Sequence, residues 1–471
     1  MSYLWTMSDL VAALRGRPMG VLPAGITGIS IDSRSIEPGQ AFFAIRGDRV
    51  DGHDYAGVAI ANGAALLVVS EGKLPALGRL SAPMIVVEDV LEAMVRLGCA
   101  ARDRSRAKII AVTGSVGKTT TKEMLRHVLS ACGSVHASPA SFNNHWGVPL
   151  TLCRLPENTD FGVFEIGMNH PDEIRPLVKM VRPHVAIITA IAPVHIGHFR
   201  DLDEIAAAKA EIFEGLAPGG HAVINRDTEK FTALELAAQA AGVETIHTFG
   251  SHARADFRML EFAPSETGSV LWANIAGQTL EVPLGAPGRH IAENALAVLG
   301  AASLVGADLG RVAEALSTVS AEKGRGRRHR LSVGGGVATL IDESYNANPA
   351  SMRATIALLR ETAPGEGGRR IAVLGDMLEL GALSADKHKG LLGPLLDAGV
   401  TDLWLAGAEM AVLRDAAEGS LNVTYRDTAD ALAAFAAASI APGDVIMVKA
   451  SNSLGFGRIV ARLTETFPAA S

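Results

Sequence analysis

The sequence predicts an α/β protein of three domains, and three observations carry this prediction. The chain has 471 residues, about three times a common domain length of roughly 150. Apolar, β-branched runs alternate with Ala-rich amphipathic stretches, as in βαβ units with mainly parallel sheets. The charged stretch Arg102–Lys108 and the Gly/Arg cluster Lys323–Arg330 mark two composition shifts. We therefore expect a small α/β domain over residues 1–106, a central, mostly parallel sheet flanked by helices over 107–323, and a Rossmann-like α/β domain over 324–471.

The composition is that of a folded chain with no general affinity for anionic polymers. Hydrophobic residues make up 48% of the chain, charged residues 20% and aromatic residues 5%. The 43 Lys and Arg against 50 Asp and Glu give a net charge of -7, which excludes a global positive field for nucleic acid or membranes. Residues 1–20 lack the apolar core of a secretory signal, and no apolar run reaches the roughly 18 to 20 residues of a membrane span. We expect a cytoplasmic protein in which the isolated Cys99, Cys132 and Cys153 are buried, inert thiols.

The strongest local signal lies at the start of the predicted central domain. Lys108–Thr121 reads KIIAVTGSVGKTTT, an apolar strand followed by a glycine turn and an amphipathic helix. In such a turn the backbone N–H groups and the helix N-terminus hold a phosphate, Lys118 reaches the β- and γ-phosphates, and Thr119 ligates Mg²⁺. Only two residues separate Gly114 from Gly117, where the general motif has four, which argues against the commonest kinases and GTPases. The sequence therefore predicts a P-loop of unusual spacing that binds a nucleotide.

Two further apolar strands end in polar residues. Phe161–Ile166 carries Glu165 among apolar neighbours, and His195 follows the run Val185–Ile191. A buried carboxylate is costly unless it is paired or bound to a metal. Each residue alone is more often structural, but ligands collect at the carboxyl ends of parallel strands. We expect Glu165 and His195 to lie beside the P-loop in one crevice.

Lys209 occupies an unexpected place in a predicted helix. The segment Asp201–Leu216 has Ile205, Ile212 and Leu216 on one face, and Lys209 falls on that same apolar face. Either its stem carries the ammonium out to water, or the lysine is used in a neutral, modified or paired form.

The last third of the chain contains a second candidate ligand edge. The predicted strand Val337–Asp342 runs into the polar turn Glu343–Pro349, before a helix that starts at Ala350. Its carboxylate, hydroxyl and amide groups suit a ribose or a phosphate, and the alternative is an ordinary Asx-rich helix cap. Predicted strands at Arg370–Asp376 and Asp444–Ser451 also end in polar residues. The basic cluster Lys323–Arg330 is either a plain linker or a loop with a phosphate-contacting arginine.

Taken together, these segments resemble the Mur ligase family. The matching stretches cover nearly the whole chain and are TGSVGKTT (113–120), FNNHWGVPLTL (142–152), FEIGMNHPDEI (164–174), APVHIGHF (192–199), AAAKAEIF (206–213), GRHIAENALA (288–297) and DESYNANPASM (342–352). The N-terminal stretch Ile31–Glu71 resembles the family's uridine-nucleotide domain. The SYNANP stretch and LGDMLELG (374–381) resemble the member that adds D-alanyl-D-alanine.

The resemblance implies an ATP-dependent, amide-forming ligase of peptidoglycan synthesis. ATP would phosphorylate the terminal carboxylate of UDP-MurNAc-tripeptide, and the amino group of D-alanyl-D-alanine would attack the resulting acyl phosphate. The expected products are UDP-MurNAc-pentapeptide, ADP and phosphate. The expected partners are these two substrates, with no nucleic acid, no membrane insertion and a monomeric state.

The resemblance also implies roles for individual residues. Lys118, Glu165, His195 and Lys209 match the catalytic set. Thr119 and Glu165 match the ligands of one Mg²⁺, Glu165 and His195 those of a second, and Lys209 matches a lysine that the family carries as a carbamate ligand. The implied ATP contacts are Thr113, Gly114, Ser115, Val116, Gly117, Lys118, Thr119, Thr120, His290, Asn294, Arg327, Asp342, Tyr345 and Asn346. The implied contacts to the other substrates are Ser33, Arg34, Arg46, Gly47, Asp48, Asn143, Asn144, Lys449 and Ser451.

Rival functions differ in single features of the sequence. Ala450 and Asn452 stand where the family commonly has Gly and Arg, which affects the dipeptide contacts. The Asp-Asn-Pro-Arg motif of the diaminopimelate-adding ligase is absent, and a folylpolyglutamate synthase would begin near its P-loop. A recycling ligase of the same family stays open. A GTPase switch lacks its Asn-Lys-x-Asp motif here, and intact Lys118, Glu165, His195 and Lys209 argue against a degenerate, non-enzymatic binder.

Overall fold

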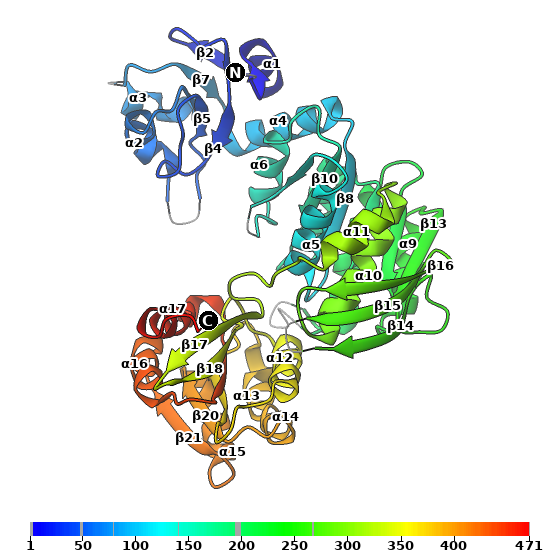
Figure 1. The fold of residues 1–471 in the computed structure, drawn as a ribbon. Helices are drawn as coiled ribbons and strands as arrows, with labels where there is room; N and C mark the ends of the chain where they lie inside the picture. The colour runs from blue at the N-terminus through cyan, green and yellow to red at the C-terminus, as the bar shows by residue number, and fades with distance from the viewer. Residues whose placement is uncertain are drawn as a thin grey trace.

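The computed structural model describes residues 3–47, 50–78, 80–139, 141–193, 199–265 and 268–470. Figure 1 shows three lobes in chain order, with the N-terminal and C-terminal lobes at opposite ends of the central one. Each lobe is built on its own sheet, of five, nine and six strands respectively. This confirms the predicted three-domain α/β architecture.

The N-terminal lobe is a small sheet with helices on both sides. Its strand order is β2-β7-β6-β5-β4, parallel except for β2, with bounds β2 Arg17–Met19, β4 Gly28–Ser30, β5 Gln40–Phe43, β6 Leu66–Ser70 and β7 Met84–Val87. The short strands β1 Trp5–Thr6 and β3 Gly25–Ile26 pair separately. The helices are α1 Met7–Leu14, α2 Ala56–Ala61, α3 Leu74–Leu77 and α4 Val90–Arg104.

Helix α4 joins the N-terminal lobe to the central lobe. Its buried residues pack in one core with the N-terminal sheet and with Leu150 and Cys153 of α6, Gly147–Cys153. At the same junction the Trp5 indole N–H donates to Cys153 O at 3.0 Å, and the Arg104 guanidinium lies 3.4 Å from the centre of the Trp5 ring. Shared apolar burial and this cation–π contact therefore fix the first two lobes to each other.

The central lobe contains a mostly parallel sheet of order β16-β15-β14-β13-β12-β11-β8-β10-β9. The strands are β8 Lys108–Thr113, β9 Val135–Ala137, β10 Phe161–Glu165, β11 Val185–Ile188, β12 His221–Asn225, β13 Thr245–Gly250, β14 Phe257–Pro264, β15 Ser269–Ile275 and β16 Gln278–Leu284. The apolar run of β8 is explained by its position, since it is paired on both edges and covered on both faces. The antiparallel strands β14–β16, which the sequence reasoning did not anticipate, extend the sheet at one edge.

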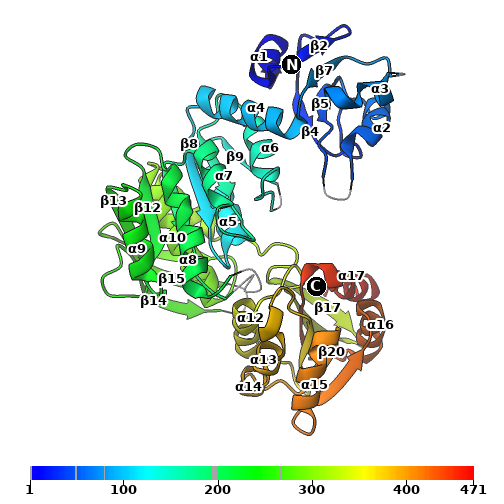
Figure 2. The ribbon, with the colours of Figure 1, turned by 180° about the vertical axis from the view of Figure 1, so that it is seen from behind.

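Helices cover both faces of the central sheet (Figure 2). One face packs against α5 Lys118–Ser130, α10 Arg289–Leu304 and α11 Leu309–Leu316. The other face packs against α6, α7 Ile174–Val181, α8 Leu202–Ala210 and α9 Phe231–Ala240. Residues 109 to 112 of β8 alternate between these two cores, which fixes the direction in which the loop after β8 leaves the sheet.

The C-terminal lobe is a doubly wound sheet of order β17-β18-β22-β19-β20-β21. Its strands are β17 Arg327–Val333, β18 Gly336–Asp342, β19 Arg370–Gly375, β20 Asp402–Ala406, β21 Asn422–Arg426 and β22 Val445–Lys449, parallel except for β17. Its helices are α12 Pro349–Glu361, α13 Ser384–Lys389, α14 Leu392–Asp397, α15 Ala411–Ala417, α16 Ala429–Ser439 and α17 Gly457–Thr466. Short 3₁₀ turns in the chain lie at Gly52–Tyr55, Glu71–Lys73, Glu211–Gly215, Gly381–Leu383, Ala408–Met410 and Asn452–Leu454.

Three local expectations differ from the structure. The apolar run Val185–Ile191 stops being a strand at Ile188, because the carbonyl of Ala190 turns to accept from the Ser115 N–H. The helix expected over 201–216 is α-helical only to Ala210 and continues as a 3₁₀ turn. The basic cluster is not a plain linker, since Arg327–Arg330 form the start of β17.

The three cysteines are free, as expected, but only Cys153 is buried, whereas Cys99 and Cys132 are partly exposed. No described helix is long and apolar enough to cross a bilayer.

Close packing of α10 against β14 leads to a stability prediction. A Cβ added at Gly300 would lie 2.1 Å from the Phe257 ring, whereas one added at Gly393 of α14 meets nothing within 4 Å. We expect Gly300→Ala to destabilise the chain by about 1–3 kcal/mol through overpacking. Gly393→Ala should be neutral or stabilising, because alanine favours helix. Urea unfolding of both variants measures the difference, and equal midpoints would contradict the packing argument.

Candidate functional site

The P-loop connects the central strand β8 to α5. In the sheet Glu165 of β10 pairs with Val112, and Ile188 of β11 pairs with Thr113, so the three strands end at one edge. Gly114 and Gly117 have φ angles of +151° and +86°. A Cβ at Gly114 would lie 2.0 Å from the Thr189 hydroxyl, so only glycine allows this close approach. The sequence therefore folds into the strand, glycine turn and helix that the motif predicts.

Residues after β11 brace this loop. The Thr189 hydroxyl donates to Val116 O at 2.6 Å. The Ser115 hydroxyl donates to Ala192 O and accepts from the Ala192 N–H, both at 2.9 Å. Sequence reasoning missed Thr189, although a threonine inside an apolar strand run was a usable signal. These bonds hold the loop so that its backbone is preorganised for an anion.

Lys118 begins α5 and lies against the loop. Its Nζ donates to Gly114 O at 2.7 Å. Burial lowers the pKa of Lys118, and the nearby charge of Glu165 opposes that shift. The structure therefore brings the P-loop lysine and the predicted metal-binding carboxylate into one electrostatic cluster.

Glu165 is a buried carboxylate with one oxygen left over. Its side chain is on the last residue of β10, and the residue is 2% exposed. Oε1 accepts from the Asn143 amide at 2.7 Å, while the buried Oε2 has no hydrogen-bond partner among the described residues. An unsatisfied buried carboxylate oxygen fits a cation, which compensates the cost of desolvation. Asn143, predicted to face the substrate, thus also orients Glu165.

Lys209 faces the core, as the helical pattern predicts. It lies near the end of α8, is 1% exposed, and has no hydrogen bond or ion pair among the described residues. Burial, reinforced by the positive charge of Lys118, holds the pKa of Lys209 well below its usual range. The alternative in which its ammonium reaches water is therefore wrong, and the amine favours its uncharged form.

Residues from the C-terminal lobe reach the P-loop. Tyr345, in the turn after β18, donates from its hydroxyl to Ser141 Oγ at 3.1 Å, and Ser141 Oγ lies 3.2 Å from Thr119 Oγ1. On the central lobe Asn294 of α10 lies against the loop, since a Cβ at Gly117 would be 2.7 Å from its Oδ1. The structure thus brings three residues predicted to contact the nucleotide, Thr119, Tyr345 and Asn294, to the same loop.

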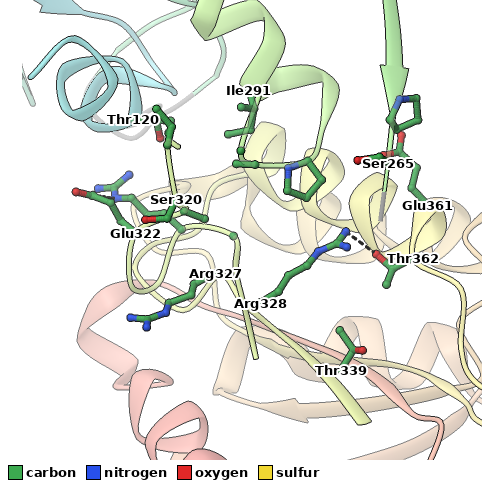
Figure 3. Close-up of a pocket in the computed structure, with 18 of the residues that line it drawn as sticks. Thr120, Ser265, Ile291, Ser320, Glu322, Arg327, Arg328, Thr339, Glu361 and Thr362 are labelled. Carbon is green, nitrogen blue, oxygen red and sulfur yellow. Dashed lines mark hydrogen bonds and ion pairs between the residues drawn. The ribbon is translucent and has the colours of Figure 1, made fainter. Parts of the chain in front are cut away.

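A cavity of about 1610 Å³ opens beside this cluster, between the central and C-terminal lobes (Figure 3). Thr120 and Ile291 line it from the central lobe, and Arg327 and Arg328 line it from β17. The Arg328 guanidinium donates to the Thr362 hydroxyl at 3.0 Å. The exposed Arg327 side chain points away from Thr362 (Figure 3). Of the residues predicted to contact the nucleotide, Thr120 and Arg327 line this cavity.

Several other predicted residues have structural contacts. The carboxylate of Asp342 accepts from Gly324 N at 2.8 Å and from the Ser344 hydroxyl at 2.6 Å, so it fixes the chain between the lobes. Lys449 is 2% exposed, with Nζ 2.9 Å from Asn346 O and 3.2 Å from Glu343 Oε2.

Ser451 and His290 are also predicted to contact a ligand. The Ser451 hydroxyl accepts from Leu378 N at 2.9 Å. Burial lowers the pKa of His290, on which the charges of Glu343 and Lys449 also act. Their ligand contacts stay predictions.

The predicted uridine contacts lie in the N-terminal lobe, away from this cluster. Ser33 and Arg34 follow β4, and Arg46 and Gly47 follow the neighbouring parallel strand β5, so both pairs are at the carboxyl edge of that sheet. Arg34 is paired with Asp32 at 2.7 Å. Asn144 caps the start of α6 by accepting from Gly147 N. Asp48 and His195 lie outside the described residues, so their roles stay predictions.

The fold and the site together define a P-loop α/β protein whose phosphate loop, buried carboxylate and buried lysine face a second domain. Models of the Mur ligase family match in three parts. The part described as the family's catalytic domain matches residues 25–102, the middle domain matches 112–302, and the glutamate ligase domain matches 326–452. The chain belongs to the Mur ligase family.

Individual relatives match over most of the chain. A UDP-N-acetylmuramoyl-tripeptide–D-alanyl-D-alanine ligase of Synechocystis is 35% identical over 94% of this chain and 93% of its own length. The ligase of the same name from Escherichia coli is 35% identical over 81% of each chain. A crystal structure of MurF from Acinetobacter baumannii, 29% identical, superposes with a TM-score of 0.84 over 98% of this chain and 99% of its own.

The effect of the Glu165 carboxylate on stability can be measured separately from its effect on turnover. We expect Glu165→Gln to retain or raise the urea midpoint, because it removes a buried charge whose Oε2 has no hydrogen-bond partner among the described residues. The same change should lower Mg²⁺-dependent turnover about 100-fold, because an amide is a poorer ligand. Glu261→Gln, at an exposed position of β14, is the control and should change neither quantity. A large loss of stability without loss of turnover would contradict the assignment.

Proposed function

We propose that this chain joins D-alanyl-D-alanine to UDP-MurNAc-tripeptide at the expense of ATP, yielding UDP-MurNAc-pentapeptide, ADP and phosphate. This is the reaction of an acid–amino-acid ligase, and its product is a precursor for peptidoglycan. The observation that carries the proposal is the match to ligases of this name over up to 94% of the chain, with the P-loop, Glu165 and Lys209 gathered at one sheet edge.

The proposed chemistry has two steps. An oxygen of the tripeptide's terminal carboxylate attacks the γ-phosphorus of ATP, the bond to ADP breaks, and an acyl phosphate forms. The amino nitrogen of D-alanyl-D-alanine then attacks the acyl carbon, loses a proton and expels phosphate through a tetrahedral intermediate. The chain's part is to hold two anions together: the P-loop N–H groups, the α5 N-terminus and Lys118 offset the charge of the transferring phosphoryl group.

The side chains present fit the magnesium ions that the family implies. Thr119 and Glu165 would hold one ion, and Glu165 with His195 a second, and the ions would neutralise phosphate charge. Within the described ranges no group of three His, Cys, Asp or Glu side chains gathers to hold a metal. Glu165 therefore needs oxygen donors of another kind, which the Thr119 hydroxyl and a modified Lys209 would supply.

We propose that Lys209 is carbamylated. The uncharged Lys209 amine, favoured by burial, would attack carbon dioxide, form an N–C bond and release one proton. The modification would replace the buried amine by an anion whose oxygens would supply ligands for Mg²⁺. Lys118, whose charge acts on Lys209, would then face an anion instead of a like charge.

Each of the three lobes would bind a different substrate. The N-terminal domain, residues 1–106, would hold the uridine nucleotide through Ser33, Arg34, Arg46, Gly47 and Asp48. The central domain, residues 107–323, would hold ATP. The C-terminal domain, residues 324–471, would close over the nucleotide and hold the dipeptide near Lys449 and Ser451. Closure of the cleft excludes water from the acyl phosphate, which water would otherwise hydrolyse. We propose that the chain acts as a monomer in the cytoplasm.

Phosphate release tests the whole proposal. Purified chain with Mg-ATP and UDP-MurNAc-tripeptide is expected to release phosphate in step with added D-alanyl-D-alanine, and mass spectrometry should find the pentapeptide. Lys118→Ala should lower the rate about 100- to 1,000-fold, as loss of one charge-stabilising donor does. Release driven by a free amino acid, or by GTP alone, would assign the chain to a sister ligase or to a switch.

Lys209→Ala tests the carbamate. We expect this variant to retain ATP binding, to lose most turnover, and to recover part of it with acetate or formate, which supply the missing carboxylate. Carbon-13 bicarbonate should give a carbamate NMR signal in the unmodified chain and none in the variant. Lys179→Ala, on α7, is the control for general effects of losing a lysine. Near-normal turnover of Lys209→Ala would overturn the role.

A further inference from the structure

Ser141 is the point where the C-terminal lobe meets the P-loop. Its Oγ lies 3.2 Å from Thr119 Oγ1 and accepts from the Tyr345 hydroxyl at 3.1 Å. Three segments far apart in sequence thus share one hydroxyl: the first turn of α5, the loop before α6, and the turn after β18. Ser141 is not among the residues that the sequence predicts to contact ATP, metal or substrate.

The same short segment also orients the second proposed metal ligand. Asn143 donates from its backbone N–H to Ser141 O at 2.9 Å and from its amide to Glu165 Oε1 at 2.7 Å. A Cβ at Gly167 would lie 2.8 Å from the amide carbon of Asn143, so the space around this side chain is filled. Residues 141 to 143 therefore contact both Thr119 and Glu165, and within the described ranges Glu165 Oε2 keeps no hydrogen-bond partner.

The segment from Ser138 to Asn143 is held in place by α5 and by the C-terminal lobe. Lys122 of α5, which is fully buried, donates to Ser138 O at 2.9 Å. The Tyr345 ring lies beneath the Arg325 guanidinium at 4.0 Å, and Tyr345 N donates to Gly324 O. A Cβ at Gly324 would lie 2.9 Å from that of Tyr345. The tyrosine is thereby fixed to the chain that joins the lobes.

Metal binding places a requirement on the Thr119 hydroxyl. A hydroxyl that gives a lone pair to a cation must direct its proton to another acceptor, and Thr119 is only 5% exposed to water. Ser141 Oγ lies within reach of that proton and has two lone pairs, one for Thr119 and one for Tyr345. All three hydroxyls are therefore compatible with a cation on Thr119.

We propose that Ser141 is a positioning residue that links the Thr119 hydroxyl to Tyr345, so that cation binding at the P-loop and docking of the C-terminal lobe stabilise each other. This inference rests on the proposed function, because it needs a nucleotide with its cation on the loop. It makes Ser141 a coupling point between the two lobes that surround the cleft, and it assigns Asn143 to the support of Glu165.

Calorimetric titration of the full chain with ADP, once with Mg²⁺ and once with a chelator, tests the proposal. Ser141→Ala should weaken Mg-ADP binding about 3- to 10-fold, because the Thr119 proton loses its acceptor. Binding of metal-free ADP should change less than about 2-fold, since that contact does not need the proton redirected. Ser141→Thr keeps the hydroxyl and should restore Mg-ADP affinity.

Ser138→Ala is the matched control. It removes a hydroxyl from the same loop, and the Ser138 Oγ has no hydrogen-bond partner in the part of the chain that the structure describes. The backbone bond from Lys122 to Ser138 O is unaffected by this change. We expect this variant to bind both forms of ADP as the unmodified chain does.

A double-mutant cycle tests the link to the C-terminal lobe. Tyr345→Phe keeps the ring beneath Arg325 and removes only the hydroxyl, so it should weaken Mg-ADP binding in the unmodified chain and add little to Ser141→Ala. Additive losses, or equal losses with and without Mg²⁺, would overturn the coupling. Absence of Mg-ADP binding by the unmodified chain would overturn the proposed function and this inference with it.

Discussion

The parallel register of β8 between β10 and β11 is the constraint on which the site depends. It ends three apolar strands at one edge and places the P-loop, Glu165 and the Thr189 brace there. The free-energy cost of burying polar groups is concentrated near the same edge. There the Oε2 atom of Glu165 and the side chain of Lys209 are removed from water without protein partners among the described residues. Such groups destabilise an empty fold and are stabilised when ligands bring opposite charge.

Much of the fold and part of the site could be predicted from sequence because their signals are local. The glycines at 114 and 117, the β-branched run before them and the apolar stripe of α5 specify the P-loop unit within a few residues. Glu165 and Lys209 were identifiable because a charge within an apolar pattern is expensive wherever the chain folds. The Mur ligase family models match three successive parts of the chain, one in each lobe.

Features that depend on distant segments could not be predicted in this way. Ser141 contacts residues 22 positions before it and 204 positions after it, and nothing in its own neighbourhood marks it. Strands β14–β16 pair antiparallel with one another, and this pairing between separate segments is not specified by the composition of any one strand. The carboxylate of Asp342, a predicted nucleotide contact, accepts hydrogen bonds from Gly324 and Ser344. Gly324 belongs to the segment that connects the central and C-terminal lobes, and its sequence position gives no sign of this contact.

The two junctions between lobes differ in mechanical character. At α4 the apolar cores of two sheets merge, and Leu150 and Cys153 belong to the same packed cluster as the N-terminal strands. The clusters of the C-terminal lobe contain no described residue of the other two, and its contact at Tyr345 is a single hydroxyl. We therefore expect the N-terminal and central lobes to move and unfold as one rigid unit, whereas the C-terminal lobe can move relative to them. Relative motion of the lobes is expected to concentrate at the second junction, beside the cavity between the central and C-terminal lobes.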